Sequence, residues 1–404
     1  MLTSKGHLTY CTNIHAGEDW TAHFAALKLH FPAIKASVSP AAPMGIGLRL
    51  SHQASLELRD ADKLATFHSW LRETGAYVFT MNGFPYGDFH DTVVKDQVHA
   101  PDWTTRERLQ YTVRLADILA ELLPDDLDGG ISTSPLSYRY WFDTDEAKEL
   151  AMRAATGHIL ETIKHLQEIY LRSGKRIHLD IEPEPDGLLE TGDEFLTWYR
   201  DCLLPMGADY FAKEGVSASE SAAVIRRHLC LCYDVCHFAL GYENHAKMIR
   251  KLREMDISIG KIQISAALKA LVPEGDEPRN HVAAAFADYN EPTYLHQVIA
   301  RNAEGALTRY RDLPEALSGL AKSDAREWRA HFHVPIFHDD FGLLQSTQAD
   351  IIELLGLHNE LELSSHLEVE TYTWGVLPAN LKLDISESIS RELNWVLPLL
   401  NHTF

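Results

Sequence analysis

The sequence has little positive charge, few cysteines and no long apolar run. Its 404 residues include 37 Lys and Arg against 58 Asp and Glu, which gives a formal net charge of −21 at pH 7. A surface this acidic repels phosphate groups, so we expect no binding to nucleic acid. The cysteines number five and do not spread along the chain. This pattern argues against a disulfide framework and favours a reducing compartment.

Membrane and secretion signals are also missing. No run of about 18 consecutive apolar residues occurs, which predicts no transmembrane segment. The N-terminal Met-Leu-Thr-Ser-Lys-Gly-His lacks the apolar core of a signal peptide. We therefore expect a cytoplasmic protein. Hydrophobic residues make up 45% of the chain and charged residues 24%, as in ordinary globular proteins.

Short β-rich runs alternate with longer helical stretches through most of the chain. The helical stretches repeat apolar residues every three or four positions, as at Leu109, Val113 and Ala116. This alternation predicts parallel strands, and eight units predict a closed (β/α)8 barrel, the TIM barrel of the α/β class. The predicted strands are Leu8–His15, Gly45–Ser51, Ala76–Asn82, Gly129–Ser134, Ile177–Glu182, Leu229–Asp234, Ile259–Ser265 and Ser365–Tyr372.

A doubly wound open sheet is the alternative fold. Against it, no Gly-x-Gly-x-x-Gly motif follows the first predicted strand, and no Gly-x-x-x-x-Gly-Lys-Ser/Thr motif occurs anywhere. We therefore interpret residues 1–404 as a single TIM-barrel domain.

One stretch interrupts the alternation. Residues 266–329 are more than an ordinary connection needs, and Pro292–Ala321 has a helical pattern. We expect a helical insertion between the seventh and eighth strands, lying over the catalytic face or forming a helical subdomain. Residues 375–404 are expected to form a C-terminal helical segment.

Acidic and amide side chains stand at the ends of four predicted strands. Glu182 ends the fifth strand, Asp234 ends the sixth, and Gln263 and Glu370 lie near the ends of the seventh and eighth. Functional groups of parallel barrels gather at these carboxyl ends. Side chains two residues apart share a strand face, so Glu182 and Glu370 are the acids nearer the mouth of the barrel.

A divalent metal ion is the cofactor that this set of side chains suggests. Three carboxylates that converge without a cation repel one another, so a metal ion or a raised pKa is required. With a donor from the seventh strand, the ring suits Mn²⁺, Mg²⁺ or Zn²⁺, and its many oxygens favour the first two. Each acid by itself is typical of a surface residue at a strand end. Four such strand ends in chain order argue against that interpretation.

Three cysteines give a competing prediction of a thiolate zinc site. Cys230, Cys232 and Cys236 are close in sequence. The first two fall in the run Leu-Cys-Leu-Cys-Tyr, where small cysteines fill buried strand positions. Cysteine pairs that bind zinc usually stand further apart. We favour the structural role.

Several residues near the strand ends are candidates for substrate binding. His15 ends the first strand and Asn82 the third, although an asparagine after a strand is usually a turn residue. His331 and His333 alternate in an apolar run before the eighth strand, so they share a face and could bind a metal or an anionic substrate. The alternative is one core and one surface histidine. The apolar surroundings make His333 the better candidate of the two.

Four short motifs resemble those of the xylose isomerase-like TIM barrels. They are Ile-Glu182-Pro, Asp234-x-x-His237, Lys-Ile-Gln263-Ile and Val-Glu370-Thr. This superfamily includes sugar isomerases, ketose 3-epimerases, inosose dehydratases and the endonuclease IV group. The position of the segment from His331 to His333 resembles that of the Asp-x-His segment that holds an extra zinc in the last group.

Other segments resemble, more narrowly, the EboE family. These are Leu8 to His15, Asn82-Gly-Phe-Pro-Tyr-Gly87 and Tyr294-Leu-His-Gln297. That family is named for metabolite traffic and is encoded in ebo-type clusters. The resemblance implies a small-molecule metabolite as ligand and other proteins of such a cluster as partners.

The superfamily resemblance implies a reaction and roles for the residues. Glu182, Asp234 and Glu370 would bind a divalent metal, and His237 would bind a substrate hydroxyl. A histidine normally supplies the fourth ligand, where this chain has Gln263, a weaker ligand for zinc. Glu182 and Glu370 would move a carbon-bound proton of a sugar, polyol or related hydroxy-carbonyl through an enediolate, giving an isomerase or epimerase.

Two further functions compete with this one. The first is a non-catalytic metabolite-binding or traffic protein of an ebo-type pathway. The second is DNA repair at a trinuclear zinc site. The acidic charge and the presence of Asn82 and Gln263, where that site needs histidines, argue against the second.

Overall fold

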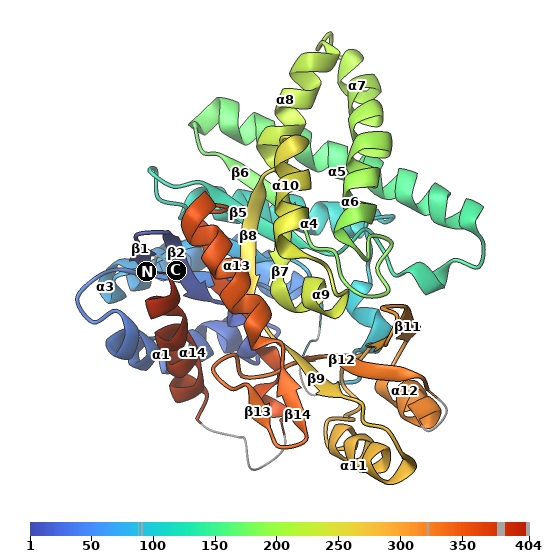
Figure 1. Cartoon of the computed structure of the whole chain (residues 1–404). Coiled ribbons are helices and arrows are strands. Elements are labelled where there is room, and N and C mark those ends of the chain that lie inside the picture. Colours follow the sequence, from blue (N-terminus) through green and yellow to red (C-terminus); the bar gives the residue numbers. More distant parts are fainter. Residues whose placement is uncertain (88, 90–91, 321–322, 378–383, 401–404) are drawn as a thin grey trace.

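Eight parallel strands form a barrel in the computed structural model of the protein (Figure 1). The structure describes residues 1–87, 89, 92–320, 323–377 and 384–400. The eight predicted strands overlap the barrel strands one for one, and the TIM-barrel prediction is confirmed. These strands are β2 (Gly6–Tyr10), β3 (Met44–Arg49), β4 (Ala76–Asn82), β5 (Gly129–Thr133), β6 (Ile177–Ile181), β7 (Leu229–Asp234), β8 (Ile259–Ile264) and β15 (His366–Val369).

The strand order is that of a nearly closed ring. It runs β2, β15, β8, β7, β6, β5, β4, β3, with parallel pairing throughout. Between β3 and β2, a parallel bridge joins Cys11 to Gly47, and Thr9 Oγ1 donates to the Gly45 oxygen at 2.8 Å. The short β1 (Leu2–Thr3) pairs antiparallel with β2. The carboxyl ends of the parallel strands therefore meet at one mouth.

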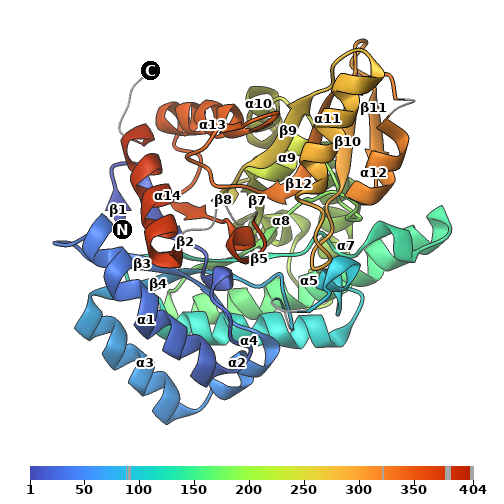
Figure 2. The same cartoon turned by 90° about the horizontal axis from the view of Figure 1, so that it is seen from below.

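Helices cover the outside of the barrel, as Figure 2 shows for α1, α3, α4 and α5. In α4 the predicted stripe is confirmed, because Leu109 and Ala116 are buried while Glu107 and Gln110 are exposed. Among the described residues, no helix has the length and apolar composition that crossing a bilayer requires. The covering helices are α1 (Trp20–Val38), α2 (His52–Glu57), α3 (Ala61–Thr74), α4 (Arg106–Leu122), α5 (Asp145–Ser173), α6 (Gly192–Trp198), α7 (Leu204–Ala212), α8 (Ala218–His228), α9 (Val235–Leu240), α10 (His245–Glu254), α13 (Gln348–Leu361) and α14 (Ile385–Leu399).

The insertion between β8 and β15 is a second sheet rather than a helical unit. Its six strands lie in the order β11, β10, β12, β9, β14, β13, and every pairing is antiparallel. It also extends beyond residue 329, since β12 ends at His333 and two more strands follow. Its elements are β9 (Ala267–Leu271), α11 (Asp276–Ala287), β10 (Val298–Asn302), β11 (Leu307–Tyr310), α12 (Leu313–Gly319), β12 (Ala325–His333), β13 (Asp340–Phe341) and β14 (Leu344–Ser346).

A hairpin replaces most of the helix expected over Pro292–Ala321, so that prediction is wrong. The hairpin joins β10 to β11 through a turn at Asn302. The Asn302 side chain accepts from the backbone N–H groups of Glu304 and Ala306, and Gly305 adopts a φ of 85°. Asparagine and glycine favour such a turn, and the β-branched Val298 and Ile299 favour the strand before it.

The insertion packs onto the barrel through one continuous core. Trp328 of β12 and Phe286 of α11 belong to the same cluster of buried apolar residues as the barrel strands. Helix α9, which follows β7, contacts β9 and β12. The end of β12 therefore comes to the mouth of the barrel.

The C-terminal helix α14 accounts for residues 385–399 of the predicted helical segment. Residues 378–383 and 401–404 of that segment lie outside the described part of the chain. The Glu392 carboxylate of α14 is buried and accepts from Thr371 Oγ1 at 2.7 Å and from the Ile336 N–H at 3.3 Å. Burial raises the pKa of Glu392 from 4.5 to about 8.

This shift makes folding stability depend on pH. Folded protein keeps the Glu392 proton up to about pH 8, whereas the unfolded chain loses it near pH 4.5. The contribution of Glu392 to stability is therefore lost as pH rises between these values. We expect Glu392→Gln to raise Tm relative to the parent more at pH 8 than at pH 5, measured by thermal unfolding. Glu387→Gln, at an exposed position of the same helix, is the control. An equal Tm difference at both pH values would contradict the assignment.

Candidate functional site

The predicted strand-end residues meet at the barrel mouth. Glu182 follows β6 and Glu370 follows β15, and both side chains are buried. The Gln263 amide of β8 lies between them, and its Nε2 donates to Glu182 Oε1 at 3.3 Å and to Glu370 Oε2 at 2.5 Å. In this arrangement Gln263 is a donor to both carboxylates. Its assignment as a metal ligand stays a prediction.

Two asparagines complete the surroundings of Glu370. Asn82, at the end of β4, and Asn13 donate to Glu370 Oε1 at 2.9 and 2.8 Å. Asn82 therefore lies beside Glu370, and its role in substrate binding stays a prediction. Asn13 was missed because it lies in a short 3-10 turn after β2 (Thr12–Ile14), with no strand pattern of its own. Its place directly after the first strand was the available signal.

Asp234 links β7 to the helix that follows. Its Oδ1 caps α9 by accepting from the His237 N–H at 3.1 Å, and it also accepts from Ser265 Oγ at 2.7 Å. This cap explains the aspartate at the start of α9. The second carboxylate oxygen, Oδ2, is buried without a hydrogen-bond partner. An unpaired buried carboxylate oxygen is costly unless a cation or proton faces it.

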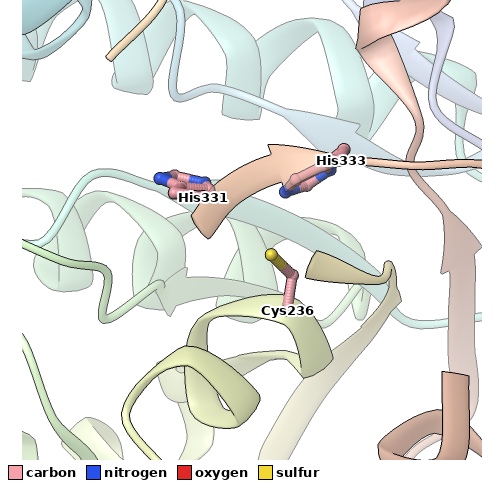
Figure 3. A group of neighbouring side chains, drawn as sticks. All are labelled: Cys236, His331 and His333. Atoms are coloured by element: carbon pink, nitrogen blue, oxygen red, sulfur yellow. The ribbon is translucent and has the colours of Figure 1, made fainter. Parts of the chain in front are cut away.

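Three histidines stand beside these acids. His237 Nε2 lies 3.2 Å from His331 Nε2, and His331 Nδ1 lies 2.8 Å from Gln297 Oε1. His333 Nδ1 donates to the Glu370 backbone oxygen at 2.9 Å, while its Nε2 is buried without a partner. Figure 3 shows His331 and His333 on β12, with Cys236 of α9 facing them. Asp234, His237 and His333 place potential ligand atoms within 4.8 Å of one another.

Burial controls the charge of these groups. It raises the pKa of Glu182 well above 4.5, and the nearby Glu370 and Asp234 carboxylates raise it further. Burial and Asp234 likewise raise the pKa of Glu370 to about 8, and burial lowers that of His333 to about 4. Near neutral pH burial therefore favours a protonated Glu370 and a neutral His333 imidazole. A divalent cation that binds these side chains would displace their protons.

The enclosed space is small. The cavity among these side chains measures about 60 Å³, far below the roughly 300–1,000 Å³ of ordinary small-molecule pockets. Phe89, Tyr294 and Tyr372 line it and contact one another with ring centroids 5.0–5.3 Å apart. This volume is enough for an ion and a few waters, so binding of a whole sugar would require part of the aromatic wall to move.

Two candidates from the sequence, His15 and a zinc site made of three cysteines, are not part of this site. His15 is buried against α1, where its ring stacks on His30 at 4.9 Å and its Nε2 lies 3.0 Å from the Tyr10 hydroxyl. It does not line the cavity. The three neighbouring cysteines fall into separate groups: Cys230 lies beside His178 and Asp180, Cys236 beside His331 and His333, and Cys232 beside Glu182 and Gln263. They do not form a thiolate zinc site together.

No protein-family model matches the chain, and no curated protein matches its sequence. Among solved structures, a xylose isomerase-like TIM barrel protein from Mycobacterium smegmatis in complex with magnesium is similar. Its TM-score is 0.51 at 12% identity, over 99% of this chain and 98% of that chain. The chain has the xylose isomerase-like TIM barrel fold.

Two other similar structures have lower TM-scores. The IOLI protein with a bound zinc atom has a TM-score of 0.47 at 13% identity, over 98% of this chain and 99% of that chain. A D-tagatose 3-epimerase-like protein has a TM-score of 0.46 at 12% identity, over 98% of each chain.

One buried ion pair supports the site from below. Lys261 Nζ donates to Glu368 Oε1 at 2.8 Å and to Ser132 Oγ at 3.1 Å, and both charged side chains are fully buried. Lys261 and Glu368 each stand two residues before a site residue, on the same strand face. Their pairing forms the layer directly beneath Gln263 and Glu370.

Breaking this pair should destabilise the barrel. Lys261→Met leaves the Glu368 carboxylate buried without its cation, so we expect a loss of about 3–5 kcal/mol in unfolding free energy. Adding Glu368→Gln removes the isolated charge and should recover part of that loss. Urea unfolding of the parent, the single variant and the double variant checks both statements. A single variant within 1 kcal/mol of the parent, on the order of a surface ion pair, would show that the pair does not support the site.

Proposed function

We propose that the protein is a divalent-metal-dependent isomerase or epimerase acting on a sugar or related polyol or hydroxy-carbonyl metabolite, in the cytoplasm. The observation that carries the proposal is the pair Glu182 and Glu370, which are buried at the barrel mouth. Both accept a hydrogen bond from the same Gln263 side-chain amide. Two carboxyl groups facing one small cavity are what a proton transfer between two positions of a substrate requires.

The residues present fit a divalent metal ion. Asp234 Oδ2 and His333 Nε2 are both buried without a hydrogen-bond partner. Together with Glu182 and Glu370 they supply oxygen and nitrogen donors suited to Mn²⁺, Mg²⁺ or Zn²⁺. When bound, such an ion acidifies the carbon-bound proton beside a carbonyl and stabilises the enediolate that forms.

The side chains divide the remaining work. One of the two glutamates, as carboxylate, takes the carbon-bound proton, and the other, as acid, returns a proton on the far side of the enediolate. Without a metal the pKa of Glu370 is about 8, and a bound cation would lower it and so favour the carboxylate form that takes a proton. Asn13 and Asn82 hold Glu370 through its other oxygen. In this proposal His237 and His331, whose Nε2 atoms lie 3.2 Å apart, exchange their mutual hydrogen bond for bonds to substrate hydroxyls.

A second candidate function is non-catalytic metabolite binding or traffic of the EboE kind, with other proteins of an ebo-type cluster as partners. Gln263 favours this second function. Its amide nitrogen donates hydrogen bonds to both glutamates, at the position where the xylose isomerase-like barrels that the sequence resembles have a metal-binding histidine. A carrier needs a pocket that holds cargo but no proton transfer.

Metal content tests the first part of the proposal. Elemental analysis of the purified protein should find a divalent metal, and Asp234→Asn should lose one equivalent, because Oδ2 is replaced by an amide. The control is Asp209→Asn, at an exposed position of α7, which should keep the parent's content. A native protein that holds no metal and takes up none on titration would refute the metal-dependent function.

Isotope exchange tests the second part. The metal-loaded protein, incubated with sugars deuterated beside the carbonyl, should release deuterium to water, measured by NMR. Glu182→Gln and Glu370→Gln should lower this rate by about 10²–10⁴-fold, since each removes a proton-transfer group. Glu387→Gln is the control. Binding of a sugar without any exchange would instead establish the carrier function.

A further inference from the structure

A second group of metal-ligating side chains lies at the opposite end of the barrel. Asp128 immediately precedes β5, His178 is the second residue of β6, and His366 is the first residue of β15. These are the amino ends of the strands, whereas Glu182 and Glu370 follow the carboxyl ends of β6 and β15. The geometry points to a divalent-cation site of zinc type at this floor of the barrel, independent of the proposed function.

The distances match those around a tetrahedral ion. Asp128 Oδ1 lies 3.3 Å from His366 Nε2, and Asp128 Oδ2 lies 3.7 Å from His178 Nε2. Ligand atoms bonded to zinc at 2.0–2.2 Å with tetrahedral angles stand about 3.4 Å apart. The three side chains place their ligand atoms within 4.8 Å of one another. A bound ion would draw the three ligand atoms closer together.

Asp180 orients one of the two imidazoles, that of His178. Its Oδ1 lies 2.6 Å from His178 Nδ1, which leaves His178 Nε2 to face Asp128. Its Oδ2 and His366 Nδ1 are both buried without a hydrogen-bond partner. A carboxylate behind the far nitrogen of an imidazole is a usual outer shell of a histidine metal site, and Asp180 supplies it to His178.

Gly130 of β5 provides the space for this arrangement. A Cβ at this position would lie 2.8 Å from Asp180 Oδ2 and 2.9 Å from His366 Nδ1, and 2.7 Å from a carbon of the His178 ring. The two unpartnered atoms therefore point to the same small space. Any larger residue at position 130 would push the imidazoles apart.

The donor set indicates the class of ion. Two imidazoles and one carboxylate suit Zn²⁺ or Co²⁺ far better than Mg²⁺ or Ca²⁺, which prefer oxygen. Asp128 is 30% exposed, which gives solvent access and leaves a fourth position for water. Other neighbours are Ser365 Oγ at 3.4 Å from Asp128 Oδ1 and Arg176 Nη1 at 3.8 Å from its Oδ2. Neither distance makes a strong competing contact.

Such an ion would act as a clamp on the fold. β7 and β8 separate β6 from β15 in the strand order, so His178 and His366 meet only across the inside of the barrel. A cation held by both, and by Asp128 before β5, would cross-link three strands from within. We therefore expect it to stabilise the folded protein rather than to bind substrate.

The test removes the mouth site first. In the variant with Asp234→Asn and Glu182→Gln, treated with chelator and dialysed, Zn²⁺ should still bind with one equivalent and raise Tm. Adding Asp128→Asn should abolish both effects, and Asp180→Asn should weaken zinc binding by about 10–100-fold through the outer shell. Asp125→Asn, a nearly fully exposed neighbour in the same loop, should change neither.

Cobalt gives a second measurement that does not depend on stability. Co²⁺ added to the mouth-site variant should give the intense visible absorption of a tetrahedral site with nitrogen ligands, and His366→Gln should remove it. Circular dichroism confirms that each variant is folded. If the mouth-site variant binds no Zn²⁺ and gives no such spectrum, or if Asp128→Asn changes neither, the floor site does not exist and these residues form only a hydrogen-bonded network.

Discussion

Compensation of buried negative charge is the constraint on which the barrel interior depends. Asp180, Asp234, Glu368 and Glu370 all lie inside the barrel with almost no exposure. Lys261 compensates Glu368 directly, in a layer where no water reaches either charge. The mouth above it has amide donors instead, and hydrogen bonds from amides do not cancel a full charge. For this reason the pKa values of the mouth glutamates rise.

β6 and β15 carry the same order of side-chain types from the floor of the barrel to its mouth. The inward residues of β6 are His178 and Asp180, with Glu182 directly after the strand, and β15 repeats the pattern with His366 and Glu368 followed by Glu370. The period of two places each imidazole at the floor, an acid in the middle and a glutamate at the top. The middle acids face different partners, since Glu368 pairs with Lys261 and Asp180 with His178. Both proposed sites therefore share their strands, so a shift of β6 or β15 would affect both.

The sequence allowed most of the barrel to be predicted, because parallel strands covered on both faces form recognisable apolar runs. It also placed Glu182, Asp234 and Glu370 together, since the carboxyl ends of such strands meet. The insertion was harder. Apart from β12 its strands have five residues or fewer, and the spacing of apolar residues alone does not distinguish Val298–Asn302 from part of a helix. The contact of Asn13 with Glu370 is made by a turn. It forms only when the barrel closes and brings β2 beside β15, so no local pattern predicts it.

The second sheet adds side chains to the barrel mouth. In a plain barrel the mouth would be formed by strand ends and their loops, but here β12 ends over it and brings His331 and His333 beside His237. The Thr373 hydroxyl donates to the His333 backbone oxygen, and His333 Nδ1 donates to that of Glu370. The insertion is thus joined directly to the end of β15. The imidazoles of β12 keep their positions only while the second sheet stays packed on the barrel, so loss of that packing would remove His331 and His333 from the site.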